Sequence, residues 1–354
     1  MPKKLFYLRL RLLVFISLVW VLFGVVFFEN LIHGENDLGV HVTLYKFCIA
    51  FGIIGFLITS ILIYYLRPAF SHFPVGLASI YKLGITILLF FVIAFVLLCF
   101  YFILVYKQHF NFNHFLQSFF SKIMRTHTFV IFVVDMGLMT AISIGILEVN
   151  DKYGPGIFWS MMIGEYIQPK VLNRIFIFLD INEATSIAET LGHENYFKML
   201  RKFFADITMP VLANDGEIYQ YVGDEIVLSW PNTPENKAKS LKFLRNTYYL
   251  VERQSKEYER TFGNVPRFKA GVHAGEVTAG FVGIIKRELI YSGDTVNTTA
   301  RIRGICHDVN EHFVLSGDFM KEFQTPHGYK IKAIGRIELK GRNEPVKLYR
   351  MSFE

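Results

Sequence analysis

The stretch Gly216–Trp230, GEIYQYVGDEIVLSW, decides the fold expected for the second half of this 354-residue chain. Apolar and polar residues alternate in both of its halves, and Val-Gly-Asp-Glu separates them. Runs of period two around a glycine predict two antiparallel strands joined by a tight turn, with Gly223 at positive φ. The turn carries two adjacent carboxylates, Asp224 and Glu225, which a solvated loop tip does not require.

The segments on either side of this hairpin follow the order strand, helix, hairpin, helix, strand. Residues 174–181 predict a buried strand, and residues 182–212 predict two helices broken near Gly192. We expect a long polar helix from about Pro234 to Phe262 and two paired strands, RFKAGVHAG and EVTAGFVG, in residues 267–283. This order is that of the α+β ferredoxin-like βαββαβ fold.

In that fold the first strand lies beside the hairpin, so Asp180 at its end can approach Asp224. Two carboxylates at close range repel each other unless a cation lies between them. Hard oxygen ligands favour Mg²⁺ or Mn²⁺, shared with substrate phosphates. The residues alone also permit a structural explanation, in which Asp180 caps the following helix and Asp224 forms the turn.

A second group of polar residues lies in YSGDTVNTTARIRG, residues 291–304, which predicts a turn that enters a helix. Asn297 and Arg301 are four residues apart and therefore share one helix face. Together they can bind a hydroxyl and a phosphoryl oxygen, and the guanidinium can stabilise developing negative charge. The alternative is a solvated surface arginine. We expect Asp294 to cap this helix and not to bind a metal ion.

The first half of the chain is predicted to span a membrane. The chain is 52% hydrophobic with a mean hydropathy of +0.34, which is high for an ordinary soluble protein. Four stretches are long enough to cross at about 20 residues each: Leu12–Phe28, Phe47–Leu66, Leu83–Tyr106 and Phe129–Leu147. We therefore expect an all-α transmembrane domain at 1–149, an amphipathic linker at 150–173 and a soluble domain at 174–354.

The distribution of Lys and Arg predicts the orientation. Basic residues precede the first span, whereas the loop Glu29–Thr43 has none, which places the N-terminus in the cytosol. An even number of spans then puts the C-terminal domain there too, in a multi-pass protein of the cell (inner) membrane. Lys107, Lys122 and Arg125 would face outward, against the rule. The net charge of +7 requires no nucleic-acid partner, because basic residues are not interleaved with aromatics.

Asp135 is the ionisable residue well inside a predicted span. A carboxylate inside a span is energetically costly, which makes Asp135 a functional candidate. Alternatively, Asp135 pairs with Arg125 or Lys107. Several histidines lie in or near the outward loops, where they are candidates for metal binding or pH sensing or are simply solvated: His33, His41, His109, His114 and His127. The sequence does not identify the signal that this half would sense.

The sequences FLDI…T (178–185), YVGDEIVLSW, GVHAGEV, GDTVNTTAR and ELKGRNEPVKLY together resemble the class III nucleotidyl cyclase catalytic domain. The resemblance covers about Arg174–Met351. It implies a head-to-tail homodimer with composite sites, which forms 3′,5′-cyclic AMP and pyrophosphate from ATP. It also implies two Mg²⁺ or Mn²⁺ ions per site.

The resemblance assigns a role to each matching residue. The metal ligands would be Asp180, Asp224 and the carbonyl of Ile181. From the other subunit, Asn297 would orient the ribose and Arg301 would stabilise the transition state. Lys340 would hold the terminal phosphate, and Thr185 would contact the substrate. No dedicated protein base is implied. His273 in GVHAGEV is expected to be a satisfied core residue.

Gln220 and Ile290 stand where family members read the base. Adenylyl-specific members usually carry Lys at the first position and Asp or Thr at the second. Gln both donates and accepts hydrogen bonds, so Gln220 suits adenine or guanine. Ile290 can pack on a base but cannot read its exocyclic group. We expect ATP as substrate, with GTP or mixed specificity as the alternative.

Three other functions are weighed. A catalytically silent receptor domain is disfavoured because Asp180, Asp224, Asn297 and Arg301 are all retained. A diguanylate cyclase would need Gly and Phe where Val222 and Ile226 stand in VGDEI, and it lacks the Asn-x-x-x-Arg helix. A transporter or channel with a cytoplasmic regulator would have only four spans.

Overall fold

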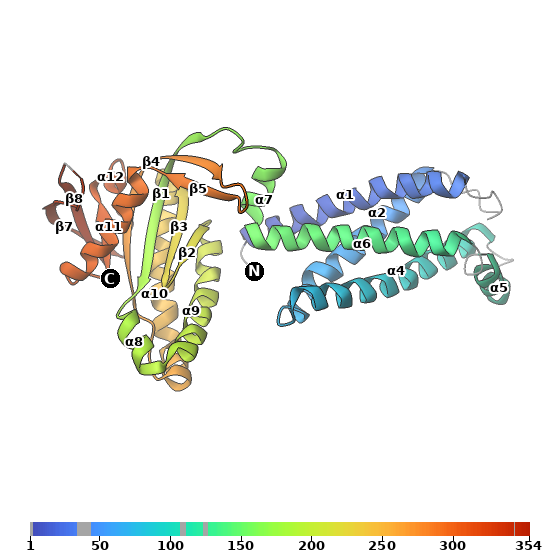
Figure 1. Cartoon of the computed structure of the whole chain (residues 1–354), viewed down its shortest axis with the longest axis horizontal. Helices are drawn as coiled ribbons and strands as arrows, with labels where there is room; N and C mark the ends of the chain where they lie inside the picture. Colours follow the sequence, from blue (N-terminus) through green and yellow to red (C-terminus); the bar gives the residue numbers. More distant parts are fainter. Residues whose placement is uncertain (1–2, 34–43, 107–110, 123–126, 343) are drawn as a thin grey trace. The chain divides into compact units, whose positions relative to one another are not determined.

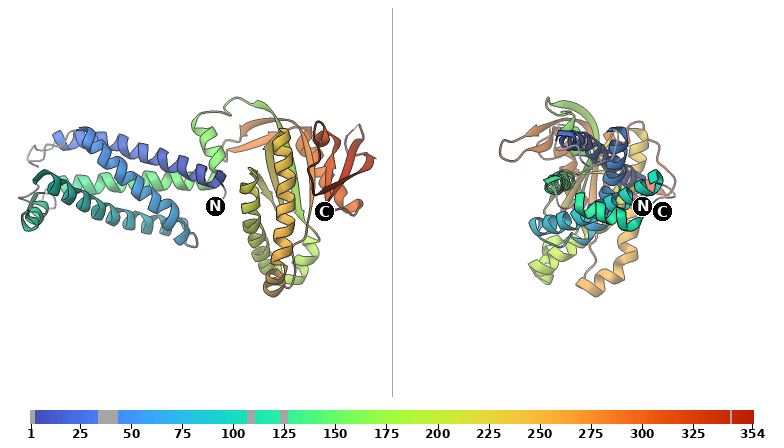
Figure 2. Two further views of the ribbon diagram at one scale, coloured as in Figure 1. Left: turned by 180° about the vertical axis from the view of Figure 1, so that it is seen from behind. Right: turned by 90° about the vertical axis from the view of Figure 1, so that its right-hand side faces the viewer.

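The computed structural model describes residues 3–33, 44–106, 111–122, 127–342 and 344–354. It divides into two compact units, Phe6–Phe158 and one built mainly from Trp159–Glu354 (Figures 1 and 2). The division falls inside the predicted linker, 150–173. The boundaries 1–149, 150–173 and 174–354 themselves stay a prediction.

The first unit is all-helical, as predicted. Its elements are α1 (Lys3–His33), α2 (Leu44–Ile61), the π-helix η1 (Leu62–Leu66), α3 (Arg67–Ala69), α4 (Val75–Tyr106), α5 (Phe112–Lys122), α6 (His127–Tyr153) and α7 (Pro155–Met162), whose last residues belong to the second unit. Within the described residues, four segments are long and apolar enough to cross a membrane: Leu5–Glu29, Leu44–Ala69, Val75–Ile93 and Val133–Tyr153. The third differs from the predicted Leu83–Tyr106: among the described residues it begins at Val75 and ends at Ile93.

Polar contacts tie α6 to its neighbours. Lys82 Nζ lies 2.7 Å from Glu148 Oε1, and Arg67 forms an ion pair with Asp151. Asp135 lies in α6, where its Oδ2 is buried without a hydrogen bond among the described residues. Its predicted partners Lys107 and Arg125 lie outside the described residues. The side chains of the five outward histidines also lie outside the described part of the structure.

The second unit is built on one mixed sheet of eight strands. They are β1 (Lys170–Ile181), β2 (Glu217–Val222), β3 (Glu225–Pro231), β4 (Phe268–Val282), β5 (Glu288–Ser292), β6 (Phe313–Ser316), β7 (Tyr329–Ile337) and β8 (Val346–Phe353). The order is β2-β3-β1-β4-β6-β8-β7, and β5 pairs with β4. The helices are α8 (Ala184–Leu191), α9 (His193–Ala213), α10 (Pro234–Phe262), α11 (Asp294–Asp308) and α12 (Gly317–Met320). The predicted βαββαβ order is confirmed, with β1 beside the hairpin.

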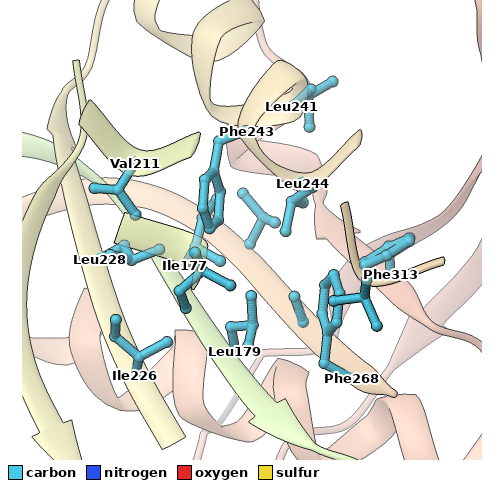
Figure 3. Close-up of a cluster of buried hydrophobic side chains, with 14 of the residues drawn as sticks. Ile177, Leu179, Val211, Ile226, Leu228, Leu241, Phe243, Leu244, Phe268 and Phe313 are labelled. Atoms are coloured by element: carbon cyan, nitrogen blue, oxygen red, sulfur yellow. The ribbon is translucent and has the colours of Figure 1, made fainter. Parts of the chain in front are cut away.

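The main core lies between one face of this sheet and the helices α9 and α10 (Figures 2 and 3). Met199, Phe203 and Ile207 recur at helical spacing on α9 and are fully buried. Ile177 and Leu179 meet them from β1, because alternate residues of a strand share a face. Burial of an Ile or Leu side chain contributes about 1.5–3 kcal/mol, so this layer anchors the end of β1 that carries Asp180.

One strand prediction is wrong. Residues 267–283 do not form two paired strands, because Phe268–Val282 make the single strand β4, which pairs with β1 along its whole length from Lys170 to Ile181. Gly275 is not in a turn but beneath α11, where an added Cβ would lie 2.6 Å from the Thr295 hydroxyl oxygen. The turn at Gly223 has φ +63°, and the helix break occurs at Gly192, both as predicted.

Candidate active site

Three carboxylates converge where β1 ends. Asp180 pairs in register with Glu225, the first residue of β3, and Asp224 precedes it in the turn. Burial raises the pKa of the Asp180 carboxyl above its usual range; Arg303 opposes this and Asp224 adds to it. Burial also raises the pKa of Glu225, again opposed by Arg303. Asp180 does not cap the next helix, whose N-cap is Glu183 without a side-chain hydrogen bond.

The cation beside these carboxylates is Arg303, which the sequence analysis missed. Its Nη1 lies 3.1 Å from Asp180 Oδ2, and its Nε lies 2.7 Å from Glu225 Oε2. The helix α11 reaches this position because β4 carries Gly271, where any Cβ would collide with the backbone of Arg303. The feature of the sequence that could have indicated this residue is the second arginine in ARIRG, two residues after Arg301.

Asn297 and Arg301 lie elsewhere on α11. Arg301 Nη2 lies beside Gly341, where an added Cβ would be 3.3 Å away. Its Nη1 is buried and has no hydrogen-bond partner among the described residues. Residues two apart on a helix are about 200° apart around its axis, so Arg301 faces away from the side on which Arg303 meets Asp180. Asn297 is exposed on the Arg301 side.

The loop that carries Lys340 is fastened to the same helix. Arg342 Nε lies 3.6 Å from Asp294 Oδ2, and its Nη1 donates to Thr298 Oγ1 at 3.4 Å. Lys340 is exposed within this loop. Asp294 was predicted to cap α11, which is wrong: the N-cap is Gly293 at φ +148°, and Asp294 is the first helical residue, held by Arg342 and Thr298.

Gln220 and Ile290 lie next to a contact between β2 and β5. A bulge between Ile218 and Gln220 puts Gln220 opposite Val227, on the sheet face away from α9 and α10. On that face the Tyr291 amide donates to the Tyr219 hydroxyl at 3.2 Å, and the two rings are 4.9 Å apart. Ile290 precedes Tyr291 and is 36% exposed. This tyrosine pair was not predicted from the sequence.

Two further predictions have plain outcomes. His273 is buried, and its Nδ1 lies 2.7 Å from the Ser316 hydroxyl. Burial lowers its pKa to about 4, so it is a neutral core residue, as predicted. Thr185 is exposed in the first turn of α8 and has no polar side-chain contact among the described residues.

The comparisons with known proteins identify the family. The model of the adenylate and guanylate cyclase catalytic domain matches residues 169–352, about half of the chain. The chain belongs to this family. Adenylate cyclase 2 of Rhizobium meliloti (strain 1021) is 33% identical over 200 residues, which are 56% of this chain and 55% of the relative. Guanylate cyclase 2D of Rattus norvegicus is 24% identical over 53% of this chain and 17% of its own length.

The cyclase fold is also found among solved structures. A bacterial light-regulated adenylyl cyclase superposes with a TM-score of 0.53 at 18% identity, covering 60% of this chain and 63% of its own. This similarity shows the fold alone. The chain spans about half the length of its Rhizobium relative and much less of the guanylate cyclase.

The candidate site offers ligands of the kind that divalent cations prefer. Asp180 and Asp224 offer hard oxygen ligands, and the Ile181 carbonyl ends the same strand. The three carboxylates at the end of β1 are not arranged to hold one ion between them, and no other cluster of three His, Cys, Asp or Glu side chains suited to a metal ion occurs in the described part of the chain. Two carboxylates and a carbonyl form an incomplete shell of the kind that Mg²⁺ completes with water and substrate phosphates.

Proposed function

We propose that this chain is an adenylate cyclase that converts ATP into 3′,5′-cyclic AMP and pyrophosphate at sites shared by two copies of the chain. One observation supports a site shared by two chains. Arg303 meets Asp180 of its own chain, so Arg301, about 200° away on α11, faces elsewhere. If Arg301 acts on the substrate held at the carboxylates, those carboxylates belong to a second chain. A homodimer then has two equivalent sites.

The residues divide the reaction between the subunits. Asp180, Asp224 and the Ile181 carbonyl of one chain would hold two Mg²⁺ or Mn²⁺ ions. When bound, such ions lower the pKa of the ribose 3′-hydroxyl and neutralise the departing phosphates. Asn297 of the other chain orients the ribose, and its Arg301 stabilises the charge that develops at the α-phosphorus. Lys340 holds the terminal phosphate, and Thr185 lines the substrate side of α8.

The bonds exchange within one nucleotide. The 3′-oxygen forms a bond to the α-phosphorus and releases its proton to solvent water, while the bond from that phosphorus to the bridging oxygen breaks and pyrophosphate leaves. The buried, unpartnered Nη1 of Arg301 supports a role toward an anion, because a buried charge without a partner is costly.

Support for ATP comes from the 33% identity with an adenylate cyclase over 56% of the chain. GTP is the second candidate, since Gln220 accepts as well as donates hydrogen bonds and a guanylate cyclase also matches. Gln220 and Ile290 are proposed to line the base pocket beside Tyr219 and Tyr291.

The four candidate spans support an enzyme embedded in the membrane. The positive-inside rule favours an N-terminus and a catalytic unit in the cytosol, where nucleoside triphosphates occur. We propose the inner membrane of a bacterial-type cell as its location and a signal sensed by the membrane half as its regulator.

Product identification tests the proposed function. The full chain in native membranes is incubated with ATP or GTP and Mn²⁺, and the products are identified by mass spectrometry, with Asp180→Asn as control. We expect cyclic AMP and pyrophosphate from the parent chain and neither from the variant. Cyclic di-GMP would assign a diguanylate cyclase. No cyclic nucleotide from a folded dimer would assign a silent receptor domain.

A further inference from the structure

The hydroxyl of Tyr196, in the first turn of α9, is buried and unpaired. Its oxygen has no hydrogen-bond partner among the described residues, although the side chain packs against the main core. Buried side-chain hydroxyls in proteins are nearly always hydrogen-bonded, so an unpaired one needs an explanation. If the ring served only the core, phenylalanine would serve as well, because it has no polar atom to desolvate.

Tyr196 faces the sheet. Tyr196, Leu200, Phe203 and Ile207 recur at the spacing of one helix face, and the last three are buried in the main core. Tyr196 lies at the beginning of this stripe, close to where α8 leads into α9. Because β1 leads into α8 at the same end of the sheet (Figure 1), the ring points toward the end of the sheet that carries Asp180.

A ring contact places Tyr196 level with Asp224. The chain reverses between α9 and β2 within residues 214–216, so these two elements run in opposite directions. Phe204 of α9 contacts Tyr221 of β2, with ring centroids 4.9 Å apart. Eight residues back along the helix, about 12 Å, lead from Phe204 to Tyr196. Three residues forward along the strand direction, about 10 Å, lead from Tyr221 to Asp224 at the same end.

The charges around the site agree with this placement. Burial, followed by the charges of Asp224 and Asp180, raises the pKa of Tyr196 to about 12, so the hydroxyl remains a neutral donor. Arg303 pairs with Asp180 and Glu225, whereas Asp224 has no ion pair within the described ranges. An ionised carboxylate accepts hydrogen bonds at about four lone-pair sites, so Asp224 can hold a cation and still accept from Tyr196.

We propose that Tyr196 is a positioning residue of the cation site: its hydroxyl donates a hydrogen bond to the Asp224 carboxylate when that carboxylate holds a divalent cation. This inference rests on the proposed function, because it takes Asp224 as a metal ligand. Groups that hydrogen-bond to a ligating carboxylate fix its orientation, and their removal weakens metal binding about 10–100-fold. Tyr196 acts through Asp224 and is not itself a ligand of the cation.

The test compares Tyr196→Phe with the parent, each as the full chain in lipid nanodiscs. This substitution removes one buried oxygen and keeps the ring. Mn²⁺ binding is measured without nucleotide, by paramagnetic resonance of the free ion. Tyr258→Phe is the matched control, because it removes the hydroxyl of a buried tyrosine on the neighbouring helix α10 that donates to Asp206 at 2.6 Å instead.

Terbium supplies a second, spectroscopic measurement on the same proteins. Tb³⁺ takes hard oxygen ligands, as Mn²⁺ does, and its emission is sensitised by a tyrosine close to the ion. The sensitised emission per bound ion is measured at saturation for the parent and both variants. A tyrosine that contributes only to the fold does not change this quantity when it is replaced by phenylalanine.

We expect Tyr196→Phe to weaken Mn²⁺ binding at least about tenfold and to lower the emission per bound Tb³⁺, while Tyr258→Phe changes neither. The melting temperature without metal should not fall in Tyr196→Phe, because the lost hydroxyl was unpaired. Parent-like Mn²⁺ binding or parent-like emission in Tyr196→Phe would overturn the proposal. Equal weakening of Mn²⁺ binding in both variants would also overturn it, because the hydroxyl would then serve only the fold.

Asp224→Asn separates the role of Tyr196 from the proposed function. If this variant loses Mn²⁺ binding while Tyr196→Phe binds like the parent, the role of Tyr196 alone is wrong. If Asp224→Asn itself binds Mn²⁺ like the parent, Asp224 is not a ligand, and the cation site of the proposed function is wrong together with the role of Tyr196.

Discussion

Arg303 Nη1 lies 3.1 Å from Asp180 Oδ2, and the same guanidinium reaches Glu225. The chain therefore supplies its own counter-charge where a divalent cation is proposed to bind. Binding of that cation to Asp180 has to compete with this ion pair, because both use the same carboxylate oxygens.

Arg303→Gln should therefore tighten Mn²⁺ binding. A partly exposed ion pair contributes about 1 kcal/mol, which corresponds to about a fivefold lower dissociation constant. Paramagnetic resonance of free Mn²⁺ measures this without turnover, and Lys256→Gln, at an exposed position of α10, is the matched control. Weaker binding in the Arg303 variant would mean that Arg303 organises the carboxylates for the ion and does not compete with it.

Asp180→Asn and Asp224→Asn should each abolish cyclic nucleotide formation, because either change removes a charged ligand from the proposed metal site. Both variants should still form the dimer. Activity with Mn²⁺ and the assembly state by native mass spectrometry are the measurements. Parent-like activity in either variant would remove the two-metal explanation.

Selection between ATP and GTP should be loose. An apolar residue such as Ile290 supplies only about 1–3 kcal/mol of discrimination, and the Gln220 amide can pair with either base. The ratio of kcat/KM for ATP and GTP should stay below about 10⁴. Gln220→Lys should raise it in favour of ATP, since Lys only donates. A larger parent ratio would show that another group, such as Tyr219, reads the base.

Because His273 is buried in its neutral form, the free energy of unfolding should fall in acid. Its folded-state pKa is about 4, below the ordinary 6.5, so only the unfolded chain is protonated between these values. The unfolded state then binds more protons, and the free energy of unfolding falls as the pH drops from 6.5 toward 4. The full shift corresponds to about 3 kcal/mol.

The control for this prediction is His273→Gln, which can keep the hydrogen bond to Ser316 but does not titrate. The melting temperature of the catalytic unit, followed in the full chain from pH 7 to pH 4.5, should fall less in this variant than in the parent. Parallel curves would indicate that other groups account for the acid sensitivity.

The sequence predicted those parts of the fold that local patterns encode. The alternation around Gly223 predicted the hairpin, and the βαββαβ order brought Asp180 next to Asp224. The continuity of β4 was not predictable in this way, because one long strand and two paired strands show the same alternation. The two arrangements are distinguished only by long-range contacts: the pairing of β4 with β1 and the packing of Gly275 against α11.

The site residues that were missed depend on packing over long sequence distances. Arg303 reaches Asp180 only because Gly271 lets α11 lie against β4. Tyr219 meets Tyr291 only because of the bulge in β2. The wrong cap at Asp294 has a local cause: the backbone enters α11 at Gly293 in a conformation that only glycine readily adopts, so the side chain of Asp294 turns to Arg342 instead.

Complementation between two inactive chains tests the composite site most directly. Chains with Asp180→Asn and chains with Arg301→Ala are co-expressed with different tags, and heterodimers are purified by both tags in sequence. One site of the heterodimer then contains both substitutions, and the other site contains neither. Each variant alone should be nearly inactive, while the heterodimer should regain about half of the parent activity from its one intact site. A verified heterodimer without activity would contradict the account, because Asp180 and Arg301 would then not meet across a subunit interface.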